Sequence, residues 1–512
     1  MNTPSFLTYN ALDAACTTEA RDAFWDDLAQ DGYQPAYDMT VALYEPLMFM
    51  QTRGIKVNFE ELTATKVDIL ASAASKQEEL NKLCGRELNV NSSKDCQAYF
   101  YVERGIAPYY NEGRVTVDDL ALQRMSRGTT KRPGLREAKL VQEIRGLQKL
   151  HGTYLDIEFD ADGRMRCSYN PRGTKFGRLS SSKTVFGTGT NMQNLPQEFK
   201  KFLVADPGYV LWEVDKRQAE WVVVAYLTQD ANMLSVVESG QDTHIHTASL
   251  MFNVEKELLE YEAKLIGNNS DADYIDSLRA SDQRIADLKG KLPRTMSARQ
   301  CGKKSNHGLN YDEGFAKFAL INEMEQSEAK RIWTLYRHIY PGLPLWYEAI
   351  KRALSRDRTL TNCFNRKVRF MDAWGPDLWK AAYSMLPQST VVDSLNQGMG
   401  KIYHSVLCDK EQHNIDLLAQ VHDSILLQVP QELFFQNYPW PMFPEIQKQV
   451  YDFVSPDLTY NGRTFKIATD SKFGLNWGGF HKEMNPLGMR EVKSHNELKK
   501  TLEELGVQAR TQ

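Results

Sequence analysis

The amino-acid sequence predicts an α+β fold, and three observations support this. Residues 35–150 carry apolar side chains at helical spacing, starting with YDMTVALYEPLMFM. Two later segments, GYVLWEVD and DLLAQVHDSILLQVP, are apolar runs of strand length, and the second contains a tight turn. Between them, a helix would place four residues that recur at intervals of four on one face: Arg299, Lys303, His307 and Tyr311.

Composition indicates a folded chain of several subdomains, because 512 residues with 42% apolar and 25% charged content can bury a sizeable core. The net charge of -4 does not by itself indicate nucleic-acid binding, so contacts with DNA must come from local basic patches. Seven cysteines without paired metal-ligand spacing predict reduced thiols, no disulfides and a cytoplasmic setting. No signal peptide and no apolar run of about 18 residues is found, so we expect a soluble protein.

The stripe from Arg299 to Tyr311 predicts a binding surface for a nucleoside triphosphate. Its two cations can bind a polyanion, and the two rings that follow can pack on a sugar and a base. A solvated helix face is the alternative that spacing alone leaves open. Gly308 favours binding, since a glycine inside a helix costs about 1 kcal/mol relative to alanine and indicates a close approach or a bend. The pattern R-x-x-x-K-x-x-x-x-G-x-x-Y closely resembles motif B of family A DNA polymerases.

Two further segments resemble the metal-binding motifs of that family. GYVLWEVDKRQAEW is similar to motif A, in which Asp215, at the end of a strand, would bind both metal ions and Glu220 would exclude a ribose 2′-hydroxyl. QVHDSI is similar to motif C, H-D-E, in which the hairpin tip would bring Asp423 beside Asp215 and His422 would contact the terminal phosphate of the primer. Ser424 replaces the third carboxylate of that motif.

Other resemblances imply contacts on either side of these motifs. FGRLSSS is similar to T-G-R-L-S-S, NMQNLP to L-Q-N-I-P, DTH to D-x-H, and LWKAAYSMLPQST to R-x-x-x-N-x-x-x-Q. In the last of these, Lys380 and Ser384 replace the arginine and the asparagine. His307 stands where the family usually carries phenylalanine or tyrosine, so we expect it to influence the acceptance of dideoxynucleotides. The resemblance implies nucleotide contacts by Arg299, Lys303, His307, Tyr311, Glu220, His244 and Gln218, and DNA contacts by Arg178, Gln388, His422, Asn191, Gln193 and Asn194.

A basic strip precedes these motifs in the helical segment. It comprises Arg127, Lys131, Arg132, Arg136, Lys139, Arg145 and Lys149, and these outnumber the intervening acids Glu137 and Glu143. A solvated helix face is the ordinary interpretation of such a strip. Its place before LHGTY is where the family's thumb lies along the minor groove, so the resemblance implies that the strip binds DNA phosphates, through Lys131, Arg132, Arg136 and Lys139.

Two acidic patterns suggest nuclease chemistry and are interpreted otherwise. Tyr9 and Asp13 resemble the last motif of the proofreading exonuclease in this family, but only eight residues precede Tyr9. We therefore expect a remnant, because two-metal chemistry needs several carboxylates together. Asp156 and Glu158 form a D-x-E with no second carboxylate pair nearby, and the surrounding residues 153–170 read as a β-hairpin around a DADG turn.

The resemblance implies a right-hand polymerase fold with an antiparallel palm sheet and helical fingers and thumb. Residues 253–291 have no family counterpart of this length, and their mixed charges predict a solvated helical hairpin, with a docking site for a partner as the alternative. The expected divisions are an exonuclease-domain remnant at 1–34, an N-terminal palm segment and thumb at 35–150, palm with motif A at 151–220, fingers with motif B at 221–394, palm with motif C at 395–481, and a tail at 482–512.

The resemblance implies a template-directed DNA polymerase that extends a primer 3′ end with deoxynucleotides. Asp215, Asp423 and Lys303 would be catalytic, with two Mg²⁺ ions, or Mn²⁺ in their place, on the aspartates. A single-subunit RNA polymerase is one alternative, which Glu220 disfavours, and a catalytically dead DNA-binding subunit is another, which the aspartate pair disfavours. We also expect a phage-encoded enzyme of replication or repair in the host cytoplasm, without proofreading of its own and with a separate exonuclease or processivity subunit as a possible partner.

Overall fold

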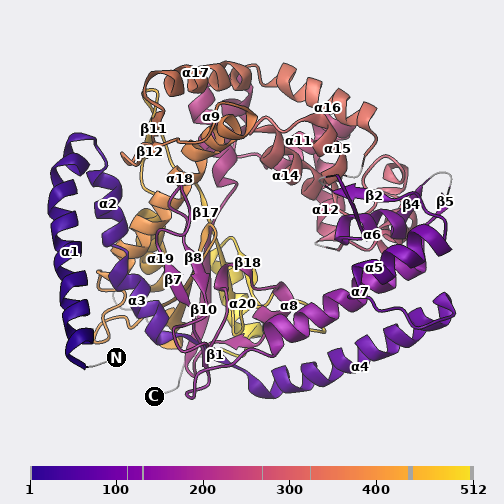
Figure 1. The fold of residues 1–512 in the computed structure, drawn as a ribbon, viewed down its shortest axis with the longest axis horizontal. Helices are drawn as coiled ribbons and strands as arrows, with labels where there is room; N and C mark the ends of the chain where they lie inside the picture. The colour runs from indigo at the N-terminus through magenta and orange to yellow at the C-terminus, as the bar shows by residue number, and fades with distance from the viewer. Residues whose placement is uncertain are drawn as a thin grey trace.

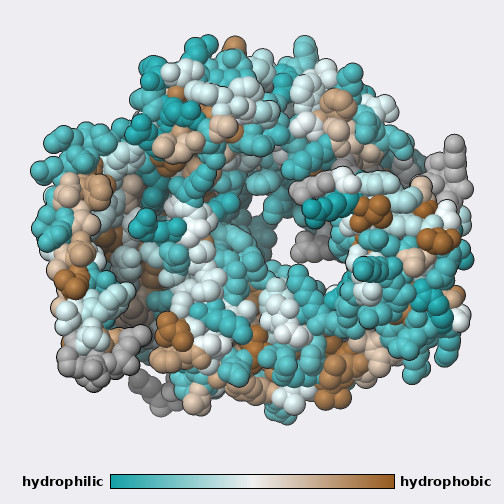
Figure 2. Space-filling view, viewed as in Figure 1, coloured by the Kyte–Doolittle hydropathy of each residue, from teal (hydrophilic) through white to brown (hydrophobic). Residues whose placement is uncertain are grey.

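The computed structural model describes residues 3–111, 113–129, 132–267, 269–322, 324–435 and 442–507, and it confirms the α+β class. The chain forms a ring around a central opening, which the ribbon shows (Figure 1) and the space-filling view shows as well (Figure 2). A central sheet lies on one side of the opening, a helical arm runs beneath it, and a second helical region closes it above (Figure 1). No helix of the described ranges is long and apolar enough to cross a bilayer.

The central sheet carries the two predicted strand segments. Its strand order is β13-β14-β10-β17-β18, and all neighbouring strands are antiparallel. Every residue of β13 and β14 is buried, because α18 and α19 pack against the sheet in one shared hydrophobic core. The bounds are β10 (Tyr209–Lys216), β13 (Asp416–Val421), β14 (Ser424–Pro430), β17 (Thr469–Gly474), β18 (Arg490–Val492), α18 (Pro376–Tyr403) and α19 (Met442–Val454).

The predicted tail, 482–512, is part of this core as far as the structure describes it. Strand β18 pairs with β17, and α20 (His495–Glu504) buries Leu498 and Leu502 in the core of the central sheet. The polar pattern of the segment did not indicate that it joins the core. Within α20, only the two apolar residues Leu498 and Leu502 pack there.

The predicted β-hairpin at 153–170 is wrong. Residues 150–155 form a short π-helical turn, and β6 (Arg164–Met165) pairs with β1 (Ile55–Val57), which also pairs with β9 (Leu203–Val204). The alternation of apolar and polar residues correctly indicated a strand, β6. Its partner strand lies more than 100 residues earlier in the chain. The other short elements here are β7 (Ser168–Asn170), β8 (Ser180–Ser182), η3 (Met192–Asn194) and α8 (Gln197–Lys200).

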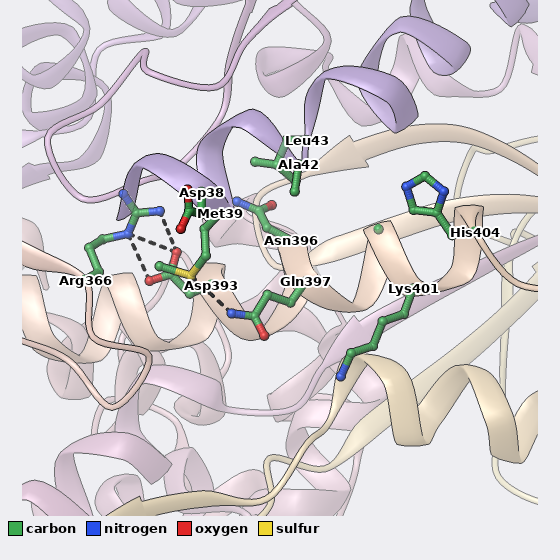
Figure 3. Close-up of a pocket in the computed structure, with 11 residues that line it drawn as sticks. Asp38, Met39, Ala42, Leu43, Arg366, Asp393, Asn396, Gln397, Lys401 and His404 are labelled. Carbon is green, nitrogen blue, oxygen red and sulfur yellow. Dashed lines mark hydrogen bonds and ion pairs between the residues drawn. The ribbon is translucent and has the colours of Figure 1, made fainter. Parts of the chain in front are cut away.

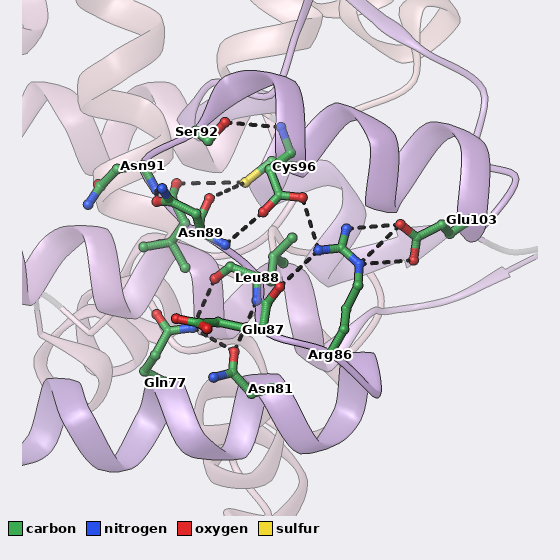
Figure 4. Close-up of polar contacts among 12 residues, drawn as sticks. Gln77, Asn81, Arg86, Glu87, Leu88, Asn89, Asn91, Ser92, Cys96 and Glu103 are labelled. Atoms are coloured by element: carbon green, nitrogen blue, oxygen red, sulfur yellow. Dashed lines mark hydrogen bonds and ion pairs between the residues drawn. The ribbon is translucent and has the colours of Figure 1, made fainter.

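The helical arm contains the segment that the spacing of 35–150 predicted. Polar contacts hold the loop after α4: Gln77 Nε2 donates to the Leu88 carbonyl over 2.9 Å, and Arg86 pairs with Glu103 at 2.9 Å (Figure 4). Helices α1 and α2 lie side by side at the left edge of the molecule, on the side of the central sheet that is away from the opening (Figure 1). The bounds are α1 (Thr3–Gln30), α2 (Gln34–Val41), α3 (Tyr44–Arg53), α4 (Phe59–Cys84), α5 (Ser93–Gln97), η1 (Ala98–Glu103), β2 (Tyr109–Asn111), β3 (Arg114–Thr116), α6 (Asp119–Arg127), β4 (Gly128–Thr129), β5 (Arg132–Pro133), α7 (Arg136–Lys149) and η2 (Leu150–Leu155).

The upper helical region follows β10 directly and includes the predicted insertion. Its bounds are α9 (Ala219–Thr228), α10 (Ala231–Glu238), α11 (Thr243–Phe252), α12 (Lys256–Ile266), α13 (Ala272–Ser281), η4 (Ala286–Leu288), α14 (Ala298–Leu309), α15 (Phe315–Ile321), α16 (Gln326–Ile339), α17 (Gly342–Asp357), β11 (Thr359–Thr361) and β12 (Lys367–Arg369). Three elements late in the chain complete the structure: η5 (Gln431–Phe434), β15 (Leu458–Tyr460) and β16 (Arg463–Phe465).

The insertion is anchored rather than simply solvated. Arg279 of α13 and Glu262 of α12 form a fully buried ion pair at 2.5 Å, and Glu262 Oε2 also accepts the backbone N–H of Ala298 over 3.0 Å. Loss of one partner from a buried pair costs about 3–5 kcal/mol, so the pair ties the insertion firmly to the first residue of α14. At the other end, Lys139 of α7 meets Asp271 at 2.8 Å, an exposed contact worth about 0.2–1 kcal/mol.

Candidate functional site

The two predicted metal-binding aspartates lie together at one end of the central sheet. Asp215 is the seventh residue of β10 and pairs with Ser424, the first residue of β14. Asp423 precedes Ser424 in the turn between β13 and β14, and its carbonyl accepts the N–H of Lys216 over 3.2 Å. The pairing of β10 with β14 thus brings together the two aspartates that the family resemblance placed side by side.

The backbone around the pair is held in an unusual conformation. His422 has a φ of 52°, and Gln218, between β10 and α9, has a φ of 51°, both in the left-handed region that side chains disfavour. Gln193 fixes the first of these turns, since its Oε1 accepts the N–H of His422 over 2.9 Å and its Nε2 donates to the Gln420 carbonyl over 2.8 Å. Gln218 Oε1 accepts the N–H of Thr243 over 2.8 Å. These bonds keep the ends of the strands rigid.

Both aspartates resist ionisation. Burial raises the pKa of Asp215 to about 6; Lys472 opposes this shift, and the charges of Glu213 and Asp423 add to it. Burial likewise raises the pKa of Asp423, with Glu220 as the next contributor. Asp423 Oδ1 is buried and has no hydrogen-bond partner within the described part of the chain. A cation at this point would relieve both the repulsion and the unmet hydrogen-bonding capacity.

The residues present fit a hard divalent cation. Magnesium is held through one or two carboxylates, with water and substrate phosphates completing the coordination. Over the described residues, no group of three or more His, Cys, Asp or Glu side chains is arranged to hold a metal ion. Asp215 and Asp423 offer two such carboxylates, and the Asp215 side chain is 41% exposed.

Replacing Asp215 by asparagine should raise the melting temperature of the metal-free protein at pH 8. A carboxyl whose pKa is raised in the folded state binds its proton more tightly there, so stability falls as pH rises from 3.8 to about 6. The advantage of the variant should therefore be full above about pH 6 and vanish near pH 4. Thermal unfolding in EDTA at pH 8, 6 and 4 measures it, with Asp68→Asn on the exposed face of α4 as the control. Equal melting temperatures at pH 8 would contradict the shift.

The predicted stripe lies on α14, except for its last member. Arg299 and Lys303 lie on α14, and Arg299 Nε pairs with Asp242 at 2.8 Å. Lys303 is exposed, and its charge acts on the pKa of Asp215. Tyr311 lies in the turn after the helix. A Cβ on Gly308 would lie 2.2 Å from Oε2 of Glu313, so a close approach exists there, but by this carboxylate.

Glu220 connects the stripe to the aspartates. It occupies the first turn of α9, where its Oε1 pairs with Arg178 Nη2 at 2.5 Å and its Oε2 accepts the Tyr311 hydroxyl at 2.5 Å. The His307 ring, which is 67% exposed, has its Nδ1 3.8 Å from the same Oε2. Burial and the Glu220 charge raise the pKa of Tyr311 well above its usual value, so the phenol remains a hydrogen-bond donor. The predicted nucleotide-binding residues Glu220, His307 and Tyr311 are thus in contact.

His244 is not at the surface of this site. It is buried between α11 and α14, where its Nδ1 lies 3.1 Å from Asn306 Nδ2, and burial lowers its pKa to about 4. A Cβ on Gly302 would lie 2.1 Å from the His244 carbonyl oxygen, so the two helices touch here. The neutral ring accepts a hydrogen bond that holds the helices together, and in this conformation it is buried.

The predicted DNA contacts have different local roles. Asn191 Oδ1 caps the η3 turn by accepting the N–H of Gln193 over 3.0 Å, and the Asn194 carbonyl accepts the Tyr154 hydroxyl over 3.1 Å. His422 is exposed beside Asp423, and Gln388 is partly exposed on α18. Asn191, Gln193 and His422 thus cluster at the turn of β13 and β14.

Two residues of the basic strip pair with acids, and a third bonds to backbone carbonyls. Arg136 pairs with Glu79 at 3.0 Å, and Lys139 with Asp271 at 2.8 Å. Arg145 donates to the Val90 and Val117 carbonyls over 2.7 and 2.8 Å. Of the predicted phosphate contacts, Lys131 and the Arg132 side chain lie outside the described residues. Exposed pairs of this kind exchange readily for phosphate, since each is worth only about 0.2–1 kcal/mol.

Sequence reasoning missed two residues that border Asp215, namely Glu213 and Lys472. Glu213 is buried on the same face of β10, where it pairs with Lys472 of β17 at 3.1 Å and accepts the Trp477 indole N–H over 3.3 Å. Burial would raise the pKa of Glu213, but Lys472 and Lys200 more than offset it, so the pKa is lowered and the carboxylate stays charged. A glutamate inside an apolar strand is the signal that could have identified this pair.

A separate cleft of about 440 Å³ lies away from the aspartates, between α2, α3 and α18 (Figure 3). Arg366 and Asp393 form a buried ion pair at 2.8 Å on its wall, and His404 lies at its other end. None of the sequence-predicted site residues lines it. The residues predicted from the sequence therefore lie outside this cleft.

Comparison with known proteins agrees with this geometry. The model of a family described as DNA polymerase family A matches residues 59–265 and 284–438, and the break falls on α13 of the insertion. The thermostable DNA polymerase I of Thermus aquaticus is 25% identical over 409 residues, covering 75% of this chain and 42% of that protein. DNA polymerase I of Streptococcus pneumoniae serotype 4 is 24% identical over 444 residues, covering 83% and 45%. The chain thus spans less than half the length of these curated relatives.

A solved structure shows the same fold. It is described as the POL domain of Pol1 from M. smegmatis in complex with DNA primer-template and dNTP, and it matches with a TM-score of 0.68 at 19% identity. The match covers 86% of this chain and 70% of that one. The predicted polymerase fold is thereby confirmed. Because the family model covers well over half of the residues, including Asp215, Glu220, Arg299 and Asp423, the chain belongs to DNA polymerase family A.

Proposed function

We propose that this chain is a template-directed DNA polymerase that adds deoxynucleotides to a primer 3′ end. The observation that carries the proposal is the meeting of Asp215 and Asp423 at the end of the central sheet, with the buried Asp423 Oδ1 lacking a partner among the described residues. Helix α14, which carries Arg299 and Lys303, lies at the upper side of the opening (Figure 1). Carboxylates for cations and cations for a triphosphate are the two parts that nucleotidyl transfer requires.

Two Mg²⁺ ions on Asp215 and Asp423, or Mn²⁺ in their place, would lower the pKa of the primer 3′-hydroxyl and neutralise the leaving pyrophosphate. Arg299 would exchange Asp242 for the β or γ phosphate, since the paired guanidinium is 40% exposed. Lys303 would donate a proton to the leaving group, because its ammonium is exposed on the same helix face. His422, exposed beside Asp423, would contact the terminal phosphate of the primer.

The sugar and base of the incoming nucleotide would meet Glu220, His307 and Tyr311. The Tyr311 hydroxyl bonds to Glu220 in this conformation, so movement of α14 would release the phenol and make room for a template base. Arg178 would reach the minor-groove side of the primer end, and Gln388, Asn191, Gln193 and Asn194 the DNA beside it. We further propose that 35–150 forms an N-terminal palm segment and the thumb, and that 221–394 forms the fingers.

Primer extension by the purified chain tests the proposal. With a primed template, Mg²⁺ and the four deoxynucleotides, we expect full-length product, and with ribonucleotides we expect little. Failure to extend in both Mg²⁺ and Mn²⁺ would overturn the polymerase assignment. Efficient extension with ribonucleotides would favour a single-subunit RNA polymerase, and tight DNA binding without extension would favour a dead DNA-binding subunit.

The isolated chain should show no 3′-to-5′ exonuclease activity. Asp13 lies on α1, which is exposed along nearly its whole length, and no three acidic or histidine side chains gather there among the described residues. Release of nucleotides from a 3′-mismatched primer, in Mg²⁺ without deoxynucleotides, measures the activity. Degradation that Asp13→Ala abolishes would contradict the prediction. Activity restored by a second polypeptide would instead support a separate exonuclease subunit and, with it, a split or phage-encoded polymerase.

A further inference from the structure

A row of alternating charges borders the proposed metal site. Glu213 and Asp215 lie two residues apart on β10, so both side chains project from the same face of the sheet. Lys472 lies directly opposite Glu213 on β17. Its Nζ is 3.1 Å from Glu213 Oε2 and 3.9 Å from Asp215 Oδ2, so the ammonium lies between the two carboxylates and is closer to Glu213.

Glu213 is well fixed by its other contacts. Its Oε1 accepts the Trp477 indole N–H over 3.3 Å and lies 3.5 Å from the Ser424 hydroxyl. Lys200 covers the Trp477 ring, with Nζ 4.3 Å from the ring centroid. The Glu213 side chain is 11% exposed, whereas the Lys472 side chain is 33% exposed. The carboxylate is therefore the rigid partner, and the lysine is the one that can move.

We propose that Glu213 is a positioning residue that holds Lys472 away from Asp215 and so keeps Asp215 free to bind a divalent cation. The proposal rests on the metal site of the proposed function. A lysine and a carboxylate in full contact are about 2.7–2.9 Å apart, so at 3.9 Å Lys472 is about 1 Å short of a direct bond to Asp215. Without Glu213, the flexible lysine would close this distance and compete with the cation for the carboxylate.

Binding of Mn²⁺ to the metal-free protein, followed by the electron paramagnetic resonance of the free ion, tests this directly. Glu213→Gln should weaken Mn²⁺ binding at least about tenfold, equivalent to about 1.4 kcal/mol. Lys472→Met should bind Mn²⁺ at least as tightly as the wild type, because it removes the competitor. The double variant should return to within about threefold of the wild type. The Mg²⁺ concentration for half-maximal extension should shift in the same order.

Controls separate this role from a structural one. Glu60→Gln, at an exposed position of α4, should leave Mn²⁺ binding unchanged, and melting temperatures in EDTA report folding of each variant. Weak binding by Glu213→Gln that Lys472→Met does not restore would overturn the proposal, as would unchanged binding by Glu213→Gln. If Glu213→Gln does not fold, Mn²⁺ binding by Lys472→Met tests the proposal alone. Binding more than about threefold weaker than in the wild type would mean that Lys472 supports the cation, and would overturn the proposal. Mn²⁺ binding that Asp423→Asn leaves intact would refute the metal site itself, a separate result.

Discussion

Asp423→Asn and Asp215→Asn are each expected to reduce primer extension by at least about a thousandfold. Each removes a carboxylate whose bound cation would supply several kcal/mol of transition-state stabilisation, and each 1.36 kcal/mol is a factor of about ten in rate. Binding of primer-template DNA should be no weaker than in the wild type, because affinity comes mainly from cations that meet phosphates. Single-nucleotide incorporation under single-turnover conditions, with a parallel DNA-binding titration, measures both quantities.

Asparagine is the appropriate substitution, because it keeps the shape of the side chain at the strand end. Asp68→Asn, on the exposed face of α4, is the matched control and should extend like the wild type. Extension by either site variant within about tenfold of the wild type would show that the two aspartates do not hold catalytic ions.

Glu220→Ala should raise the ratio of ribonucleotide to deoxynucleotide incorporation by about a hundredfold, the range that a change in pocket shape can provide. The Glu220 side chain is 15% exposed and is held at both oxygens, at 2.5 Å from Arg178 and at 2.5 Å from Tyr311. After Tyr311 is released, the Arg178 contact would keep the carboxylate from moving aside for a 2′-hydroxyl. Ratios of kcat/KM for matched ribo- and deoxynucleotides measure the effect.

Glu220→Gln separates shape from charge in this prediction. The amide has nearly the same size, so the variant should retain most of the exclusion although its bond to Arg178 is weaker. A ratio that stays constant in Glu220→Ala would place the sugar discrimination elsewhere and revive the interpretation as an RNA polymerase. A rise of the same size in both variants would mean that charge rather than bulk excludes the ribose.

Much of the site could be predicted from the sequence, because its parts are local. An apolar run that ends in Asp215, a helix that begins four residues later and a turn that carries Asp423 are each encoded within a few neighbouring residues. The same holds for the helical spacing that placed Arg299 and Lys303 on α14. The expectation that the two aspartates meet came from the resemblance to a known family, and the pairing of β10 with β14 agrees with it.

Contacts between distant segments could not be predicted in this way. The prediction of a hairpin at 153–170 was wrong because β6 pairs with β1. Nothing in the local sequence indicates which strand β6 pairs with. His244 is buried because α14 packs against α11. Arg136 pairs with Glu79 of α4, which lies 57 residues earlier in the chain.

The sequence by itself thus determined which residue types stand at strand ends, in turns and on helix faces, since spacing along a single element fixes these. Only the tertiary structure decided which charges meet across elements. Lys472 lies 257 residues after Asp215 in the chain, yet β17 runs beside β10 and places the two side chains 3.9 Å apart. Sheet register brings such residues together, and register depends on the packing of the whole core rather than on any local pattern.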